Sequence, residues 1–220
     1  LKPNYAKMYN NIGNVLKDKE KLNEAIEAYK KALFIKPSLA EAHFNMGNVF
    51  KDQGNHEEAI KAYKKATSFK PEYVDAYNNM GNILKEEGKL EEAIATYNKI
   101  ITIKPDYPDA YVNIGNALKD QGKLDKAIQT FKKVISLKPD YAEAYNNLGI
   151  ALKDDGKNEE AIKAYKKAIS LKPNYAEAYN SLGNALKDAY KIDKAIKFYK
   201  KVILLNPEHS DAHRNLSYIN

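Results

Sequence analysis

The chain has 220 residues, of which 44% are hydrophobic and 30% are charged, and it contains no cysteine. This composition is typical of a folded, helix-rich protein, and the missing cysteines exclude disulfide bonds and thiolate chemistry. The net charge is +7, but Arg214 is the only arginine among the 36 basic residues. Because arginine is the preferred contact to phosphates and base edges, the basic charge does not indicate a nucleic-acid partner.

The sequence has no apolar run of the length, about 18 residues, that a membrane-spanning helix needs, so we expect no membrane partner. The first residues, Leu1-Lys2-Pro3-Asn4-Tyr5, have neither the apolar core nor the cleavage-site pattern of a signal peptide. The lack of cysteine does not fix the compartment. A reducing interior is the default, and on that basis we expect a cytoplasmic location.

Four residue types recur along the chain with a period of 34 residues, which indicates a repeat protein. The prolines of this period are Pro3, Pro37, Pro71, Pro105, Pro139, Pro173 and Pro207. The glycines are Gly13, Gly47, Gly81, Gly115, Gly149 and Gly183. The alanines are Ala25, Ala59, Ala93, Ala127, Ala161 and Ala195. Four residues after each alanine stands an aromatic residue, in order Tyr29, Tyr63, Tyr97, Phe131, Tyr165 and Tyr199.

Each repeat is predicted to form two helices. In the fifth repeat, Leu148 and Leu152 lie on one face of the first helix, and Gly156 offers the left-handed conformation that ends it. Pro173 then blocks continuation of the second helix. A hairpin of this kind cannot bury both apolar faces alone, so it must stack on its neighbours. Counted from Ala6, the repeats occupy residues 6–39, 40–73, 74–107, 108–141, 142–175 and 176–209, with a partial repeat or capping helix at 210–220.

Small residues at positions 8, 20 and 27, an aromatic residue at position 24 and proline at position 32 resemble the tetratricopeptide repeat family over essentially the whole chain. The resemblance implies an all-α fold, a right-handed superhelical solenoid of six helix-turn-helix units plus a terminal helix, forming one array over residues 1–220. The sequence of residues 109–119 looks most like repeats of the superhelical domain of O-GlcNAc transferase and its bacterial relatives. Glu20 and Tyr190 depart from the pattern, because they replace the turn glycine at position 15, and we expect differently shaped turns there.

The resemblance also implies that the first helices line a concave groove. Positions 6 and 9 of these helices carry asparagine, which is a poor residue inside a helix. Because a primary amide pairs with a peptide N–H and C=O together, we predict that these side chains bind an extended peptide. The alternatives are that the asparagines bond locally to neighbouring helices, or that duplication copied them without selection. The predicted residues are Asn11, Asn45, Asn79, Asn113 and Asn147 at position 6, and Asn14, Asn48, Asn82, Asn116 and Asn184 at position 9.

Other kinds of site find little support in the sequence. No phosphate-binding loop and no nucleophile–base pair stands out, so we predict neither an enzyme nor a cofactor. His209 and His213 are four residues apart, but His209 lies in a turn between repeats, so we predict no metal site. Paired lysines such as Lys30-Lys31 recur on the second helices, where they are predicted to be solvated. The first helices lack the cations with which some family members clamp a C-terminal carboxylate.

Three functions remain open at this point. The first is a scaffold that binds a protein or peptide ligand in its groove. The second is the substrate-recruiting part of a larger, glycosyltransferase-like enzyme. The third is an array that self-associates end to end. The sequence starts in the tail of one repeat and stops inside a first helix, so we expect a piece of a longer protein whose first helix, about residues 6–19, exposes an apolar flank.

Overall fold

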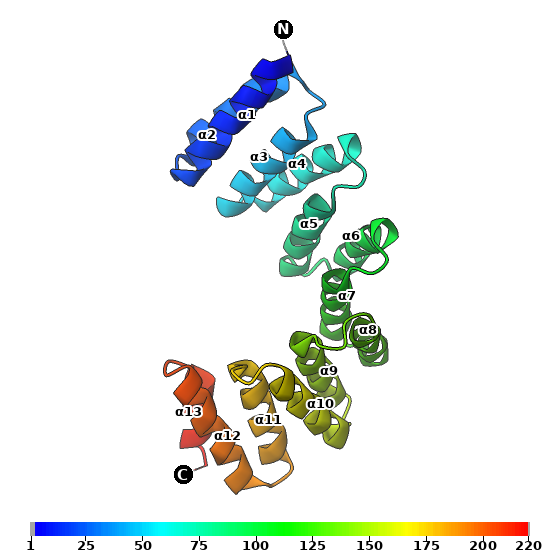
Figure 1. Ribbon diagram of the computed structural model, residues 1–220, viewed down its shortest axis with the longest axis vertical. Helices are drawn as coiled ribbons and strands as arrows, with labels where there is room; N and C mark the ends of the chain where they lie inside the picture. The colour runs from blue at the N-terminus through cyan, green and yellow to red at the C-terminus, as the bar shows by residue number, and fades with distance from the viewer. Residues whose placement is uncertain (1–2, 220) are drawn as a thin grey trace. The chain divides into compact units, whose positions relative to one another are not determined.

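The computed structural model describes residues 3–219, and every regular element in that range is an α-helix (Figure 1). The first-helix members of the repeats are α1 (Pro3–Asp18), α3 (Ala40–Asp52), α5 (Val74–Glu86), α7 (Pro108–Asp120), α9 (Ala142–Asp154), α11 (Ala176–Asp188) and α13 (Ser210–Ser217). The second-helix members are α2 (Leu22–Ile35), α4 (His56–Phe69), α6 (Leu90–Ile103), α8 (Leu124–Leu137), α10 (Asn158–Leu171) and α12 (Ile192–Leu205). The predicted all-α array of helical hairpins is thereby confirmed.

Packing divides the chain into two units, Leu1–Pro105 and Asp106–Asn220. In unit 1, α1 packs on α2, α3 on α4 and α5 on α6, and each hairpin contacts the first helix of the next. Unit 2 repeats this order from α7 to α12, and α13 packs on α12. The hairpins therefore bury their second apolar faces against one another within each unit, as the repeat pattern predicts.

The close approach of the two helices in each hairpin depends on the glycine at position 8. A Cβ added at Gly149 would lie only 2.5 Å from Cε1 of Tyr165, which is closer than non-bonded carbons come. The ring of Tyr165 therefore occupies the space that a side chain on α9 would need, and only 1% of Tyr165 is exposed. The same glycine–aromatic pair recurs in all six hairpins, and it sets the distance between their helices.

The turns at Glu20 and Tyr190 do not differ in shape from the glycine turns, and our prediction for them was wrong. Both residues adopt the left-handed conformation, with φ of 59° and 55°, as Gly156 does at 77°. The N–H of Lys191 donates to the carbonyl of Leu186 at 2.9 Å, which is the hydrogen bond that closes every other hairpin turn. Because the stacked hairpins require the same turn in every repeat, Glu20 and Tyr190 adopt the left-handed conformation although it is unfavourable for residues other than glycine.

Replacing Tyr190 by glycine should therefore raise the free energy of unfolding by about 0.5–1 kcal/mol. Glycine removes the strain of the left-handed conformation, and the greater flexibility of the unfolded chain offsets part of that gain. The Tyr190 side chain is 92% exposed, so its loss removes almost no packing. The converse control is Gly156→Ala, where a Cβ meets nothing within 4 Å and only the positive φ opposes the substitution. Urea unfolding should show opposite signs for the two variants, and equal signs would contradict this explanation.

Candidate functional site

The ten predicted asparagines all lie on first helices, from α1 to α11. Asn11 is exposed and the other nine are half-buried. The two rows are not equivalent. At position 9, the oxygens of Asn14, Asn48, Asn82 and Asn184 accept hydrogen bonds from tyrosines of their own hairpins. At position 6, Asn79 donates to Asn48 of the preceding repeat.

The clearest example is the group formed by Asn48, Tyr63 and Asn79 in unit 1. The Tyr63 hydroxyl donates to Oδ1 of Asn48 at 2.8 Å, and Nδ2 of Asn79 donates to the same oxygen at 3.0 Å. The Asn79 amide also lies 3.4 Å from the Tyr63 hydroxyl oxygen. One carbonyl oxygen therefore joins the core aromatic residue of its own hairpin to the first helix of the following one.

The same group recurs at the end of unit 2. Tyr199 donates to Oδ1 of Asn184 at 2.8 Å, and Asn215 on α13 donates to it at 2.9 Å. The tyrosine-to-asparagine bond is also present from Tyr29 to Asn14 at 2.8 Å and from Tyr97 to Asn82 at 2.7 Å. We call the pairs Asn48/Asn79 and Asn184/Asn215 amide rungs.

These bonds fix which way each amide of a rung points. In the Asn48/Asn79 rung they use the oxygen of Asn48 and the nitrogen of Asn79. The N–H groups of Asn48 and the carbonyl oxygen of Asn79 stay outside this network. An N–H group and a carbonyl oxygen are the kinds of group that pair with a peptide main chain.

Sequence reasoning missed the part played by position 5. In the first junction, Nδ2 of Asn45 donates at 3.1 Å to Oδ1 of Asn10, which is only 6% exposed, and not to Asn14. Asn146 occupies the same position in the fifth repeat and is 5% exposed. The signal was present in the sequence, since asparagine inside a helix at a position that faces the next repeat indicates a hydrogen-bonded junction.

The middle of unit 2 interrupts the rungs. Phe131 has no hydroxyl to give to Asn116, and Ile150 offers no acceptor to Tyr165. At the junction after Ile150, position 6 is Ser181, whose side chain is shorter than asparagine. Oδ1 of Asn146 is buried and has no partner among the described residues. The junction between the fifth and sixth repeats therefore has no asparagine at position 9, where Ile150 stands, or at position 6, where Ser181 stands.

Replacing Asn48 by alanine should lower the free energy of unfolding by about 1–2 kcal/mol, because the buried Tyr63 hydroxyl loses its acceptor. The matched control is Asn116→Ala, because the aromatic residue of that hairpin is Phe131 and no tyrosine hydroxyl depends on the amide. Chemical denaturation of both variants measures the difference. Equal losses would mean that the tyrosine bond contributes nothing to stability.

Two carboxylates on the first helices of unit 2, those of Asp109 on α7 and Glu143 on α9, have partners within the protein. Tyr141 donates to Oδ1 of Asp109 at 2.7 Å, and burial together with this carboxylate raises the pKa of the Tyr141 hydroxyl. Nζ of Lys172 lies 2.8 Å from Oε1 of Glu143 and 4.6 Å from the ring centre of Tyr175.

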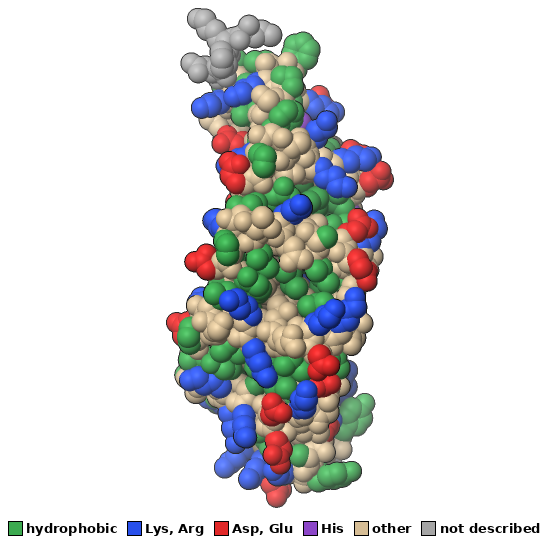
Figure 2. All heavy atoms as spheres, turned by 90° about the vertical axis from the view of Figure 1, so that its right-hand side faces the viewer, with side chains coloured by type: hydrophobic (Ala, Val, Ile, Leu, Met, Phe, Trp, Pro, Cys, Tyr) green, Lys and Arg blue, Asp and Glu red, His purple; other side chains and the backbone are tan. Residues whose placement is uncertain are grey.

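The remaining candidates have structural roles where the chain is described. Nδ1 of His209 accepts from the N–H of Ala212, and a ring nitrogen of His213 lies 2.8 Å from the Pro207 carbonyl. Within residues 3–219 no group of three or more metal-ligating side chains comes together. No helix in this range is long and apolar enough to cross a membrane. Figure 2 shows lysines and carboxylates interspersed over the face that it presents.

Solved structures of related fold cover most of the chain. MamA is 30% identical to it, with a TM-score of 0.65, over 75% of this chain and 96% of that chain. YrrB, described as a TPR protein with an unusual peptide-binding site, is 22% identical, with a TM-score of 0.64, over 86% and 98%. PilW, a type IV pilus biogenesis factor, is 18% identical, with a TM-score of 0.78, over 96% and 98%. The last two likenesses show the fold alone. Among curated proteins, none matched the sequence.

Family profiles match the chain from its first repeat to its sixth. Profiles described as TPR repeat match residues 13–54, 47–87, 81–122, 115–156 and 151–189. A profile described as tetratricopeptide repeat matches residues 176–209, which is the sixth repeat as counted from Ala6. These matches agree with the helical hairpins and with the glycine–aromatic pairs that join them. The chain therefore belongs to the tetratricopeptide repeat family.

Proposed function

We propose that this array is a protein-interaction module that binds an extended polypeptide by its main chain, along the asparagines of its first helices. The observation that carries the proposal is the orientation of the amide rungs. In each rung a tyrosine hydroxyl donates to the position 9 asparagine and fixes its amide. The amide groups that these bonds do not use are therefore held in place before a ligand binds. Such preorganisation reduces the entropy that binding must overcome.

A ladder of this kind recognises groups that every residue of a peptide has. It therefore favours extended conformation over a particular sequence, and helical or folded segments are excluded because their own hydrogen bonds already use the main chain. YrrB supports the proposal as an example of a TPR protein with a peptide-binding site. The finer prediction that ten asparagines take part stays a prediction, with Asn79 as its most direct test.

The test uses a displayed library of random unstructured peptides selected on the 220-residue chain. The best binder is then resynthesised with single N-methyl groups along its main chain, and affinities are measured by calorimetry. We expect several N-methyl positions to weaken binding more than alanine replacement of the neighbouring side chains does. The array variant Asn79→Ala should weaken the same peptide, and the control Lys65→Ala on α4 should not.

Two results would overturn the proposal. One is a selected peptide whose affinity depends on side chains and tolerates every N-methyl group. The other is a peptide that binds Asn79→Ala and Asn147→Ala as tightly as it binds the unchanged chain. Circular dichroism of each variant separates loss of binding from loss of fold.

The array also fits the substrate-recruiting part of a larger enzyme, and resemblance of its repeats to O-GlcNAc transferase is what favours that reading. Recruitment and scaffolding use the same peptide-binding surface, so the two differ only in what is attached. The sequence that flanks these residues in the intact gene distinguishes them: a glycosyltransferase domain there supports recruitment, and its absence leaves the scaffold.

A further inference from the structure

The second helices of the two units differ in charge. In unit 1, α2, α4 and α6 carry six lysines and six carboxylates, so their formal charges cancel. In unit 2, α8, α10 and α12 carry ten lysines and only four carboxylates, which leaves an excess of six positive charges. Because the same helical repeat builds both units, folding does not require this excess.

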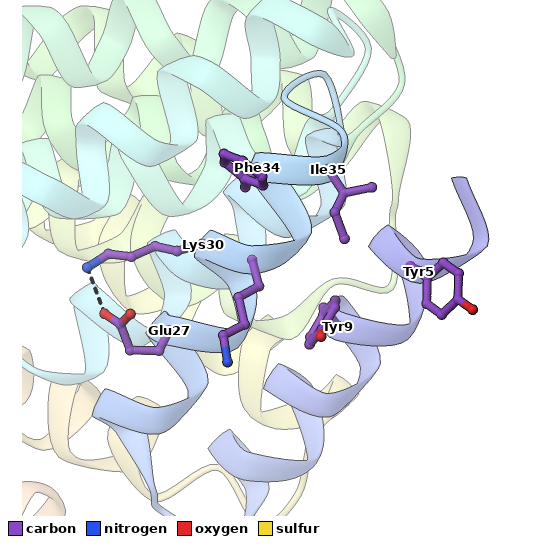
Figure 3. A pocket seen from close by; sticks show the side chains of 7 residues that line it. Tyr5, Tyr9, Glu27, Lys30, Phe34 and Ile35 are labelled. Atoms are coloured by element: carbon purple, nitrogen blue, oxygen red, sulfur yellow. Dashed lines mark hydrogen bonds and ion pairs between the residues drawn. The ribbon is translucent and has the colours of Figure 1, made fainter. Parts of the chain in front are cut away.

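The excess arises at particular positions of the repeat. Position 19 is glutamate throughout unit 1, but in unit 2 it is lysine on α8 and on α12, namely Lys126 and Lys194. Position 22 is Glu27 on α2, where Nζ of Lys30 lies 2.8 Å from its Oε1, as Figure 3 shows. On α8 that position is Gln129, and no carboxylate stands three or four residues from Lys132 on this helix. The exposed Lys132 therefore lacks the neighbouring carboxylate that partners Lys30.

Three of the unit 2 lysines border an apolar groove between α8 and α10, with a volume of about 270 Å³. Leu148 and Leu152 of α9 and Ala164 of α10 line this groove, and all three are buried. The charged residues that line it are Lys132 of α8 and Lys163, Lys167 and Glu160 of α10. The groove thus combines an apolar floor with three ammonium groups and one carboxylate.

The equivalent groove of unit 1, between α4 and α6, serves as an internal comparison. Met80 and Leu84 lie in it at the positions of Leu148 and Leu152, and its volume is about 610 Å³. Nζ of Lys61 is 2.8 Å from Oε1 of Glu57 there, so charges are paired within the protein. This groove has as many carboxylates as lysines, namely Glu57, Glu87 and Glu92 with Lys61, Lys64 and Lys89. The two grooves share their apolar floor and differ in charge.

We propose that the groove between α8 and α10 binds an acidic polypeptide segment. The segment places one apolar side chain over Leu148 and Leu152, and its carboxylates lie against Lys132, Lys163 and Lys167. The charges are complementary, which favours encounter and selects acidic partners, while burial of the apolar side chain supplies affinity. This surface lies on the second helices and is separate from the amide rungs.

The groove suits a polypeptide better than other anionic partners. Binding to a lipid surface uses apolar side chains that protrude from the protein. None of the large apolar side chains that are exposed in the described chain lies on α8 or α10. Nucleic acids are contacted preferentially by arginine, and α8 and α10 have none. A recessed apolar floor with ammonium groups around it matches an apolar side chain that stands between acidic ones.

The test selects a displayed library of short random peptides on the 220-residue chain at low ionic strength. Peptides that also bind the double variant Lys132→Glu and Lys163→Glu are removed. We expect the remaining peptides to be acidic on both sides of a large apolar residue. Replacing that residue by serine should weaken binding about tenfold, as burial of one apolar side chain predicts. Added salt should weaken binding as well, because the lysines are exposed.

Lys64→Glu is the matched control for Lys132→Glu, because Lys64 has the same position in the groove of unit 1 and the change in net charge is identical. Fluorescence anisotropy with the best peptide should show weaker binding to Lys132→Glu and unchanged binding to Lys64→Glu. Asn79→Ala should also bind this peptide normally, which separates the groove from the amide rungs. Circular dichroism of each variant checks that the helices are intact.

The proposal is overturned if no peptide distinguishes the chain from the double variant, or if the selected peptides are neutral or basic. Equal weakening by Lys64→Glu and Lys132→Glu would also overturn it, because the effect would then be one of net charge alone. Phosphatidylserine vesicles and duplex DNA are tested in parallel. If the chain binds either of them through Lys132 and Lys163 while no acidic peptide is selected, the groove belongs to that partner instead.

Discussion

Replacing Tyr97 by alanine should lower the free energy of unfolding by about 3–5 kcal/mol, which is the range for removing a fully buried aromatic ring. Tyr97 is 0% exposed, and its ring lies against Gly81, where an added Cβ would be only 2.5 Å away. Because Gly81 has no side chain, nothing on α5 moves into the space that the ring leaves. The cavity therefore stays open between the two helices of the hairpin.

Tyr97→Phe is the matched control, and the fourth hairpin already has a phenylalanine, Phe131, at the equivalent position. It keeps the ring and removes only the 2.7 Å bond from the hydroxyl to Asn82, so it should cost about 0.5–1.5 kcal/mol. Urea unfolding gives the total change, and hydrogen exchange shows whether the loss is local to α5 and α6, as expected in a repeat array. If alanine proves no worse than phenylalanine, the ring does not separate these helices.

Most of the fold could be predicted because one physical requirement recurs. Glycine at position 8 and an aromatic residue at position 24 can be recognised directly in the sequence. They recur with a period of 34 residues, and so many repetitions are not expected by chance. The turns at Glu20 and Tyr190 could not be predicted in the same way, since conformational preference there opposes the structure. Stacking between hairpins outweighs the strain of a single left-handed residue, and only the folded chain shows which effect is larger.

The hydrogen bonds among the candidate residues could not be predicted from the sequence. Asparagine at positions 6 and 9 stands out because it disfavours helices, but spacing alone does not say which amide faces which. From the sequence pattern, the aromatic residue at position 24 is expected only to fill the core. Its hydroxyl donates to Oδ1 of Asn48 and so decides the orientation of that amide.

Raising the pH above 10 should unfold the array, because its core tyrosines are stable only in their protonated form. Burial, and secondarily the charge of Asp18, raises the pKa of Tyr29 to about 12, and burial raises that of Tyr199 to about 12 beside Asp188. Burial also raises the pKa of Tyr63, Tyr97 and Tyr165 above the ordinary value. The folded state therefore keeps protons that the unfolded chain releases.

The sign follows from that difference. Below pH 10 both states are protonated and the full stability is present. Above it, each core tyrosine lowers the free energy of unfolding by up to about 1.4 kcal/mol per pH unit until its folded pKa is reached. With several such residues the total reaches several kcal/mol before pH 12. Helix content from circular dichroism should fall over the pH range in which the buried tyrosines ionise, and tyrosinate absorbance should rise over that same range.

The double variant Tyr29→Phe and Tyr199→Phe separates the two roles of the hydroxyl. At neutral pH it should be less stable than the unchanged chain, because the bonds to Asn14 and Asn184, both 2.8 Å, are lost. At alkaline pH it should be the more stable of the two, because phenylalanine has no proton to release. Urea unfolding at a series of pH values should therefore give two stability curves that cross. Parallel curves would show that these hydroxyls ionise without unfolding the hairpins, and that burial does not control their titration.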